Sequence, residues 1–354
     1  MLIGIFFTPF HFKQYSKVVK TNDENEILFV SDCILGDFLK YLDKKKKIVV
    51  FKEFEFRKKD LLRNPFIKVF EYRNAIKYYK KFINKWIDFI KKSVKQNELI
   101  SLYIFSEKSI FVQMFMSKIK KIKRCKIVAI DEGLGFYCKS NFFDYILKIL
   151  YPVFNYLIIG FPYRYYKVLG TSSLIDEVYV RFPEFIHGKR KCKIYKIENS
   201  NMQKKIIPDK NNNLLLLTSP LSEDRIKASN KEKKLLEGIV SSIIEIGYEV
   251  TIKPHPRENL SKYYFIKEKY KDKVKLLTGV LSEEINYFDY RYIINFASSA
   301  ILDIFSSNYP LKNVITIDIF KVSKDIQIYN LTKVINYKRI KKIIEELKNV
   351  LIWR

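Results

Sequence analysis

The feature that most constrains this chain is a short continuous apolar run, rich in β-branched and aromatic residues, that recurs between longer segments with helical periodicity. Parallel strands covered by helices on both faces give such runs instead of a polar and apolar alternation. The sequence therefore predicts an α/β fold of two doubly wound, Rossmann-like domains. The runs are LIGIFF, EILFVS, KIVVF, LISLYIF and KIVAID in the first half and NLLLLTS, YEVTIKP, VKLLTG, YIINFAS and VITIDI in the second.

A length of 354 residues suits two domains, each able to bury its own core. Residues 187–213 are polar and lack a sustained apolar period, as is typical of a linker. We predict an N-terminal domain over 1–190, a linker over 191–213 and a C-terminal domain over 214–354. The last segment is predicted to form a helix with one apolar face, made by Ile340, Ile343, Ile344, Leu347 and Leu351.

The chain is strongly basic, with 66 Lys and Arg against 38 Asp and Glu and a net charge of +28. Such a charge attracts nucleic acid, anionic lipid or a polyanionic substrate, although the abundance of Lys, Ile, Asn and Tyr also fits a compositional bias. A basic membrane- or nucleic-acid-binding protein is one alternative. Because the charge is dispersed and no nucleic-acid-binding motif is present, nucleic acid is not expected as a partner.

The cysteines and the N-terminus indicate a cytoplasmic protein. The four cysteines form no CxxC pair and have no histidine at metal-ligand spacing, which favours reduced thiols and argues against zinc. Residues 1–12 are apolar but lack a basic region and a cleavage site, so they are expected to form the first strand and not a signal peptide.

Two segments bear on membrane contact. The longest apolar stretch, residues 141–161, is interrupted and is expected to be an in-plane or buried amphipathic segment instead of a spanning helix. Its interruptions are Asp144, Lys148, Pro152 and Asn155. Residues 77–95 have a helical apolar face, which predicts a surface helix docked by that face, with a membrane-surface helix as the alternative. That face consists of Phe82, Trp86, Phe89 and Ile90.

The stretch VTIKPHPREN, residues 250–259, places a histidine between two prolines directly after a predicted strand. The prolines end the strand and fix the turn, so His255 is expected at the carboxyl end of a parallel sheet, where ligands bind in open α/β folds. Lys253 adds positive charge at the same edge. A turn histidine without a role is the alternative.

A second candidate lies in YIINFASSAILDIF, residues 292–305. The strand is expected to end near Phe296, with Ser298 or Ser299 near the N-cap of the following helix. Free backbone N–H groups and hydroxyls at a helix start can bind phosphate. The alternative is an ordinary helix cap.

The first domain contributes KIVAIDEGLGFY, residues 126–137, whose strand leads into Asp131, Glu132 and Gly133. The glycines at 133 and 135 are expected to let the backbone turn and approach a ligand. A carboxylate partly desolvated beside a second one can have its pKa raised toward that of a general base. An acidic turn is the alternative. Together, the two edges are expected to face each other across an interdomain cleft.

This combination resembles the bacterial sialyltransferases of the GT-B fold, the group that includes lipooligosaccharide sialyltransferases and capsular polysialyltransferases. Their D/E-D/E-G, H-P and serine-pair motifs correspond to Asp131-Glu132-Gly133, His255-Pro256 and Ser298-Ser299. The stretches TPFHF, from Thr8, and LLLLTSPLSED, from Leu214, are also similar to that group.

The resemblance implies that Asp131 is the general base on the acceptor hydroxyl and that His255 contacts or protonates the phosphate of departing CMP. Ser298 and Ser299 would bind that phosphate, and either Glu283 or Glu284 would bind the ribose. Further donor-binding residues would be Pro256, Thr218 and Ser219, and further cleft residues Glu132, Gly133, Thr8, His11 and Lys253. His11 either lines the cleft near the sugar or packs under the first loop.

The implied reaction is inverting transfer of sialic acid from CMP-sialic acid to a hydroxyl of a lipooligosaccharide or capsular glycan. Cationic and hydroxyl groups at the phosphate would make a metal or other cofactor unnecessary. An anionic or lipid-linked acceptor places the enzyme in the cytoplasm, peripheral to the inner face of the cell membrane. Residues 161–167, FPYRYYK, are a candidate for acceptor or membrane contact, with an exposed domain edge as the alternative.

The main alternative enzyme is a CDP-glycerol glycerophosphotransferase of the teichoic-acid type, which shares the K-x-H-P and serine-rich motifs of the second domain. Another capsular sugar transferase on the same fold, such as a Kdo-type enzyme, is a further one. The Asp-Glu-Gly triplet after a first-domain strand favours sialyl transfer.

Overall fold

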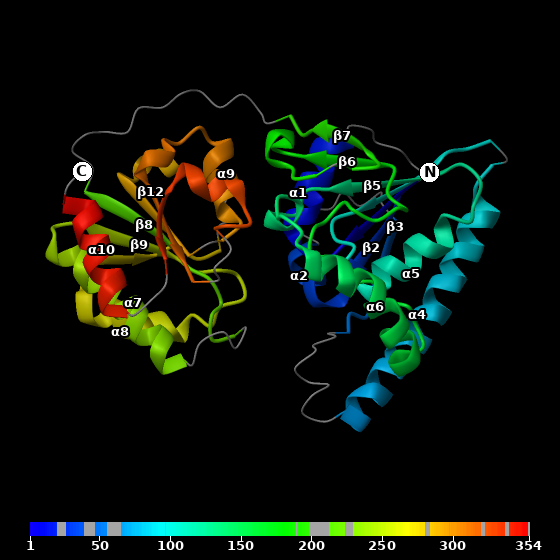
Figure 1. The fold of residues 1–354 in the computed structure, drawn as a ribbon, viewed down its shortest axis with the longest axis horizontal. Coiled ribbons are helices and arrows are strands. Elements are labelled where there is room, and N and C mark those ends of the chain that lie inside the picture. The colour runs from blue at the N-terminus through cyan, green and yellow to red at the C-terminus, as the bar shows by residue number, and fades with distance from the viewer. Residues whose placement is uncertain are drawn as a thin grey trace. The chain divides into compact units, whose positions relative to one another are not determined.

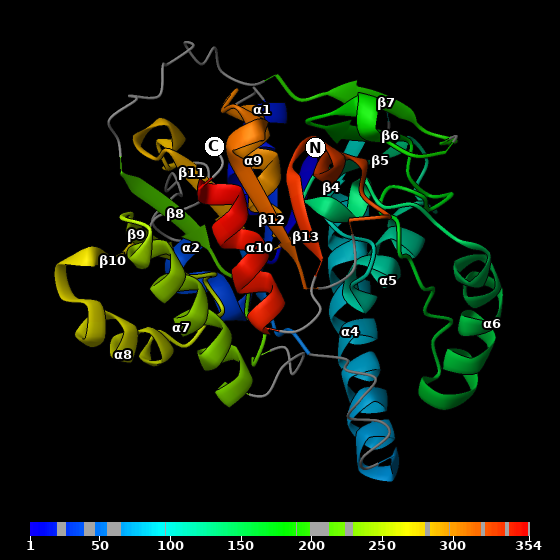
Figure 2. The same cartoon turned by 60° about the vertical axis from the view of Figure 1, so that its left-hand side comes forward.

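The computed structural model describes residues 1–19, 26–38, 47–54, 65–95, 97–188, 190–198, 212–223, 229–279, 284–296, 298–319, 323–336 and 340–352. The chain forms two compact units, Met1–Glu198 and Asn199–Arg354 (Figure 1). Each unit has its own parallel sheet, with helices packed against it (Figure 2).

Unit 1 contains a seven-stranded parallel sheet in the order β3-β2-β1-β4-β5-β6-β7. The strands are β1 Leu2–Phe6, β2 Glu26–Ser31, β3 Lys47–Phe51, β4 Ile100–Ile104, β5 Cys125–Ile130, β6 Glu177–Val180 and β7 Lys193–Lys196. The α-helices are α1 Pro9–Val18, α2 Leu35–Phe38, α4 Pro65–Ser93, α5 Ile110–Ile119 and α6 Phe142–Ile159. The strand order reverses between β1 and β4, which makes that position the switch point of a doubly wound sheet.

Unit 2 repeats this plan with six parallel strands in the order β10-β9-β8-β11-β12-β13. The strands are β8 Asn213–Leu217, β9 Glu249–Lys253, β10 Val274–Leu276, β11 Tyr292–Asn295, β12 Val314–Asp318 and β13 Lys333–Asn336. The α-helices are α7 Ser229–Glu245, α8 Ser261–Tyr270, α9 Ala300–Ser306 and α10 Ile340–Ile352. The switch point lies between β8 and β11.

The apolar runs form the strands because both faces of each sheet are covered. In β8, Leu214 to Leu217 are all buried, and Leu214 and Leu216 belong to one core cluster with residues of α7 and α10. Ile343, Leu347 and Leu351 of α10 are buried in the same cluster, which confirms the predicted apolar face of the last helix. Burial of such side chains is the main favourable term in folding.

The helix predicted over 77–95 belongs to the longer α4 and docks by its apolar face, as expected. Ile90 is fully buried, and Trp86 packs edge-on against Phe29 of β2 with ring centroids 5.5 Å apart. Phe89 stays largely exposed and is covered by the Lys47 ammonium, 3.7 Å from the ring centroid.

The predicted linker over 191–213 needs correction at its beginning. Residues 193–196 form β7, which pairs in parallel with β6, and Tyr195 stacks on Tyr179. All residues of β7 are exposed, so this edge strand carries no apolar run by which sequence could identify it. Unit 1 therefore extends to Glu198.

The polar residues and the proline within 141–161 do not break the helix, since residues 142–159 form α6. α6 begins at a capping box formed by Asn141 and Asp144, continues through Pro152 and ends at Gly160, whose φ of 74° suits glycine. By length and composition alone, α6 is the one helix in the described part of the chain that could cross a membrane, with a mean hydropathy of 1.4. Core helices of soluble proteins pass the same test, but only 6% of α6 is buried.

Candidate active site

Polar side chains gather at the carboxyl ends of β1, β4 and β5, which are neighbours in the sheet of unit 1. His11 lies in the first turn of α1, directly after β1, where the Thr8 hydroxyl accepts its backbone N–H at 3.4 Å as the N-cap. Glu132 follows β5. Between them, Phe105 at the end of β4 stacks on the His11 ring, with centroids 4.2 Å apart.

His11 and Glu132 lie close together at this edge of the sheet. The His11 Nδ1 accepts the Phe7 backbone N–H at 3.1 Å, so the neutral ring carries its proton on Nε2. That Nε2 lies 3.5 Å from Oε2 of Glu132. The His11 ring is buried, whereas the Glu132 side chain is about one quarter exposed. His11 therefore packs under the first loop and also meets a carboxylate that solvent reaches.

Asp131, by contrast, is fully buried. Its carboxylate accepts the Gly133 N–H at 2.8 Å, the Tyr137 hydroxyl, and the Arg181 Nε and backbone N–H at 3.1 and 3.3 Å. Arg181 is itself buried, so the two form an internal ion pair. The role of Asp131 as the base stays a prediction; what the structure shows is a carboxylate that ties the loop after β5 to the end of β6.

Two different physical reasons favour glycine at positions 133 and 135 of this loop. Gly133 has a φ of 147°, which disfavours any other residue. A Cβ at Gly135 would lie 2.7 Å from Cδ1 of Leu169, so this position is kept small by packing within unit 1. The expectation that Gly135 admits a ligand has no support in this geometry.

In unit 2, the predicted site residues lie at the ends of β9, β8 and β11, adjacent strands at the switch point. Leu217 pairs in register with Lys253 on one side and with Asn295 on the other. The chain segments that begin at Thr218, Pro254 and Phe296 therefore leave the sheet side by side. This is the part of an open α/β sheet at which ligands bind.

His255 is held by its own turn. Its backbone N–H donates to the Glu258 carboxylate, and its carbonyl accepts the Glu258 N–H at 2.9 Å. Its Nδ1 accepts the Arg257 N–H at 3.2 Å, so the neutral ring carries the proton on Nε2. The ring is half-buried at the sheet edge, with Pro256 exposed beside it.

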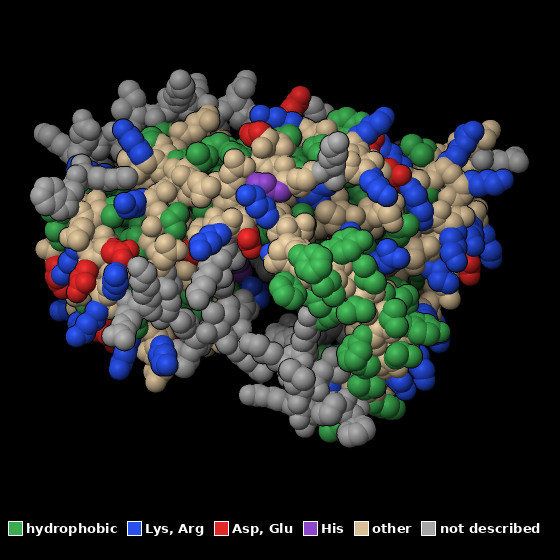
Figure 3. Space-filling model, in the orientation of Figure 1, with side chains coloured by type: hydrophobic (Ala, Val, Ile, Leu, Met, Phe, Trp, Pro, Cys, Tyr) green, Lys and Arg blue, Asp and Glu red, His purple; other side chains and the backbone are tan. Residues whose placement is uncertain are grey.

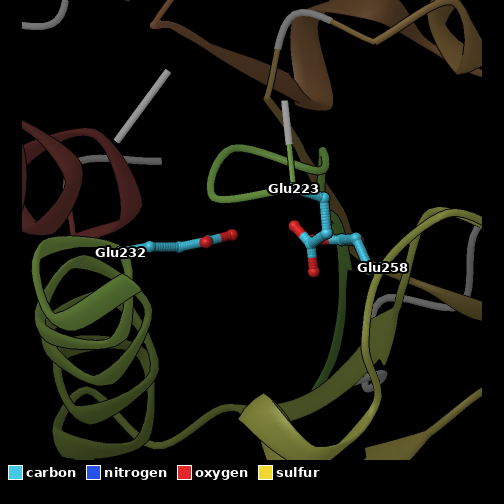
Figure 4. Close-up of side chains that lie close together, drawn as sticks. All are labelled: Glu223, Glu232 and Glu258. Carbon is cyan, nitrogen blue, oxygen red and sulfur yellow. The ribbon is translucent and has the colours of Figure 1, made fainter. Parts of the chain in front are cut away.

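Glu258 belongs to a buried ion cluster that holds this turn. Figure 4 shows the side chains of Glu223, Glu232 and Glu258 pointing toward one another. One carboxylate oxygen of each residue lies within 4.8 Å of those of the other two. The Lys262 ammonium lies 3.2, 2.5 and 2.7 Å from these carboxylates, respectively. Burial lowers the pKa of Lys262, but hydrogen bonds to Glu232 and Glu258 outweigh it and leave the pKa raised. The cation of this cluster is therefore Lys262, and the cluster is a structural one.

Thr218 and Ser219 lie at the same edge of the sheet, and their hydroxyls form hydrogen bonds within unit 2. The Thr218 hydroxyl donates to Glu258 at 2.6 Å and lies 2.8 Å from the Tyr263 hydroxyl. The Ser219 hydroxyl donates to the Phe296 carbonyl at 3.1 Å. Both side chains are buried. Their contacts with a nucleotide stay a prediction, since the hydroxyls are already bonded within unit 2.

Lys253 is buried and not solvated at the strand end. Its ammonium donates to the Pro254 carbonyl at 2.9 Å. Burial lowers the pKa of Lys253, and the carboxylates of Glu258 and Glu284 oppose that shift. Glu284 is exposed, whereas Glu283 lies outside the described residues.

The two serines of the pair, Ser298 and Ser299, differ in their contacts. The Ser298 N–H donates to Oδ1 of Asn295 at 3.1 Å, and its hydroxyl accepts the Ala300 N–H at 3.4 Å. Ser299 stands at the N-cap position of α9 without a side-chain cap bond and is exposed. Ser298 is thus used by the turn, and Ser299 is the hydroxyl presented to solvent.

Sequence reasoning missed Arg181, Glu258, Lys262 and Asn295. Two of them had a local signal: Asn295 ends an apolar strand, and Glu258 follows His255 by three residues, a spacing at which a side chain can cap a turn. Arg181 contacts Asp131, 50 residues away, which no local pattern reveals. Lys262 contacts Glu232, 30 residues away, as well as Glu258, four residues before it.

Comparisons with known proteins identify the family and the fold. The family model for Alpha-2,8-polysialyltransferase (POLYST) matches residues 42–302. No curated protein matches the sequence. The structure is similar to the calicheamicin glycosyltransferase CalG4, with a TM-score of 0.54 and 9% identity over 99% of this chain and 94% of that one.

Two further structures share the fold. Arabidopsis thaliana UGT89C1 complexed with UDP-L-rhamnose has a TM-score of 0.56 and 8% identity, covering 99% of this chain and 89% of that one. Methanocaldococcus jannaschii UDP-GlcNAc 2-epimerase has a TM-score of 0.53 and 12% identity, covering 100% and 92%. At such identities the likeness establishes the fold, and the family match over most of the chain establishes the class of enzyme. The chain belongs to the alpha-2,8-polysialyltransferase family and is a sialyltransferase-type glycosyltransferase of GT-B fold.

Proposed function

We propose that this protein transfers sialic acid from CMP-sialic acid, with inversion, to a hydroxyl of a glycan acceptor. The observation that carries the proposal is the His255 turn: an imidazole with Nδ1 held as an acceptor stands at the switch point of unit 2. In a polysialyltransferase family member, that is where a nucleotide phosphate would be released.

On the donor side, the bond between the sugar and the phosphate oxygen breaks, and the phosphate of CMP takes the electron pair. The proton on Nε2 of His255 can be donated to that oxygen. Lys253 and the exposed Ser299 supply a cation and a hydroxyl at the same edge. These groups meet the developing negative charge, so the proposed step requires no metal or other cofactor.

On the acceptor side, a carboxylate must take the proton of the attacking hydroxyl. Of the two carboxylates after β5, Glu132 is the one whose side chain is partly exposed, and its Oε2 lies 3.5 Å from the Nε2 of His11. We therefore assign proton transfer to Glu132 and the fixing of the loop to Asp131, which differs from the sequence-based assignment of the base to Asp131. The proton moves from the acceptor hydroxyl to Glu132 as the new glycosidic bond forms.

For partners and location, we propose an anionic or lipid-linked glycan acceptor and a position in the cytoplasm at the inner face of the cell membrane. The net charge of +28 supports this, because a basic surface is steered toward anionic glycans and lipids. Lipooligosaccharide and capsular polysaccharide are the acceptor classes proposed.

The test is CMP release from CMP-sialic acid, run beside CDP-glycerol, with lactose-terminated and oligosialic acceptors. We expect acceptor-dependent release by the wild type and a loss of about 100-fold or more in His255→Asn and Glu132→Gln. Glu237→Gln, which breaks only an exposed pair with Lys269, serves as the control and should retain full activity. Turnover of CDP-glycerol alone would move the function to glycerophosphate transfer, and turnover of neither donor would overturn the proposed donor class.

A further inference from the structure

The orientation of α6 is the reverse of that of a surface helix in a soluble domain. Such a helix normally buries its apolar face and turns its polar face outward. In α6 the outward half is apolar, and every residue of this set is more than half exposed; we call it the α6 face (Figure 3). It consists of Phe142, Phe143, Tyr145, Ile149, Leu150, Val153, Phe154, Tyr156 and Leu157.

The polar residues of α6 point toward unit 1 instead. Asp144 pairs with Lys167 at 3.3 Å, Lys148 lies over the Tyr166 ring at 5.5 Å, and the Asn155 amide donates to the Tyr163 carbonyl at 3.0 Å. The polar residues that argued against a spanning helix are therefore the groups that attach α6 to the rest of unit 1. Of the candidate contact segment 161–167, Tyr163, Tyr166 and Lys167 contact α6, whereas Arg164 is exposed.

The C-terminal end of α6 is fixed to α4. The Arg73 guanidinium donates to the carbonyls of Ile158 at 2.9 Å and Leu157 at 3.5 Å. One turn earlier on α4, Phe70 and Ile67 are also exposed. Further exposed apolar side chains therefore lie on the helix to which Arg73 joins α6.

Exposed basic side chains also lie on α4 and beside both ends of α6. On α4, the exposed positions after Phe70 include Lys77, Lys81 and Lys85, which follow at helical spacing along the same side. Lys139 is exposed just before α6, and Arg164 is exposed just after it. The α6 face itself contains no charged residue, and its polar atoms are the hydroxyls of Tyr145 and Tyr156.

From this arrangement we propose that α6 docks unit 1 onto an anionic lipid bilayer, with the helix lying in the plane of the interface. The apolar side chains of the α6 face would enter the acyl boundary, while the exposed basic side chains named above meet the lipid headgroups. Tyrosine is well suited to the interface because its ring is apolar and its hydroxyl stays hydrated. This inference stands independently of the donor and the reaction proposed above.

An in-plane position fits better than a spanning one. At a rise of about 1.5 Å per residue, 18 residues reach about 27 Å, short of a hydrocarbon core of about 30 Å. The contacts of Asp144, Asn155 and Leu157 also attach both ends of α6 to unit 1, so the helix cannot cross without leaving its own domain. A protein partner is less suitable, since protein interfaces carry a hydrogen bond about every 100–200 Å² and the α6 face offers almost none.

The test is flotation of the full chain with vesicles of phosphatidylethanolamine and phosphatidylglycerol, beside vesicles of phosphatidylcholine alone. The variant Ile149→Ser/Leu157→Ser removes two exposed apolar side chains of the α6 face, and the control Leu331→Ser/Ile352→Ser removes two exposed apolar side chains in unit 2. We expect the wild type and the unit 2 variant to float with the anionic vesicles. The α6 variant should lose at least about tenfold in partition coefficient, with an unchanged circular dichroism spectrum.

Two further variants sharpen the result. Phe154→Trp should add a blue-shifted emission component on mixing with anionic vesicles, and Tyr264→Trp in α8, also exposed, should not. Lys77→Gln/Lys81→Gln should weaken binding and reduce its dependence on salt. The proposal is overturned if the wild type does not float, or if the α6 variant floats equally well. A dimer in ultracentrifugation that the α6 variant abolishes, without vesicle binding, would instead make the α6 face a self-association surface.

Discussion

The buried carboxylate of Glu258 accepts the backbone N–H of His255, three residues before it in the chain. The same carboxylate receives the Lys262 ammonium at 2.7 Å and the Thr218 hydroxyl at 2.6 Å. The position of the imidazole is thereby coupled to residues on the neighbouring strand end and on α8. Changes at Glu258 should act on His255 without touching any substrate.

We expect Glu258→Gln to lower both stability and activity. The amide keeps the shape but weakens the hydrogen bonds that the carboxylate accepts from Lys262, Thr218 and the His255 N–H, which should lower the free energy of unfolding of unit 2 by about 1–3 kcal/mol. A less constrained His255 turn should lower kcat by about tenfold, with KM for CMP-sialic acid less affected. Urea denaturation and steady-state kinetics measure the two effects. An unchanged kcat at lowered stability would show that Glu258 does not position His255.

Lys262→Met should be more damaging than Glu258→Gln. It leaves Glu232 and Glu258 buried without their cation, an arrangement that costs about 3–5 kcal/mol. Chemical denaturation of the full chain at neutral pH measures the loss. A matched change at the exposed Lys348, paired with Glu245 at 2.5 Å, should leave the unfolding midpoint unchanged.

The pH dependence of this cluster has a definite sign. The pKa of Lys262 is raised in the folded state, so its stabilising contribution is complete below its usual pKa of about 10.4 and is lost as the pH rises through the raised value. Between about pH 5 and pH 9 the wild-type contribution should therefore be constant. Lys262→Met should instead gain stability as the pH falls, because its unpaired carboxylates take up protons. A variant that is equally destabilised at both ends of this range would contradict the assignment.

Substitutions of the two carboxylates after β5 should have different effects on stability and activity. Asp131→Asn removes the charge of a buried carboxylate that pairs with the buried Arg181, so we expect a loss of about 3–5 kcal/mol in unfolding free energy together with activity. Glu132→Gln should keep its melting temperature and lose about 100-fold or more in kcat. Thermal unfolding and CMP release, measured on both variants, decide the point. A stable, inactive Asp131→Asn beside an active Glu132→Gln would return the base to Asp131.

We expect Lys253→Met to weaken donor binding without lowering the stability of the fold. Burial lowers the pKa of Lys253, so the charged form is disfavoured in the folded state, and this cost is present at neutral pH and disappears only above the usual pKa. Methionine removes that cost, and we expect no fall in melting temperature. Loss of a cation near the phosphate should raise KM for the donor by about tenfold to 100-fold. An unaffected KM would place the phosphate away from Lys253.

Sequence predicted the sheets well because burial on both faces leaves a distinct trace. All ten apolar runs coincide with β1 to β5 and β8 to β12. The missed strands were β6, β7 and β13, which are short, and β7 is exposed along its whole length, so no apolar run marks it. The GT-B class followed from the strands and the motifs together and is confirmed by the family match and the shared fold.

The site was predictable only as far as strand ends determine position. His255 and Ser298 follow buried strands, so their shared edge could be inferred from sequence. The difference between Asp131 and Glu132 could not, because it depends on Arg181, which comes from another strand. Periodicity likewise indicated that α6 is amphipathic but not which half faces outward, since that depends on the partners of Asp144 and Asn155 in residues 163–167.

Each sheet takes all its strands from one continuous stretch of chain, and this affects how the protein is made. Domains generally fold as units, N-terminal first, while synthesis continues. Unit 1 holds everything its sheet requires once residue 198 has left the ribosome, before most of unit 2 exists. The α6 face is then displayed on a nascent chain, where it can meet lipid, or another nascent chain, before most of unit 2 has been translated.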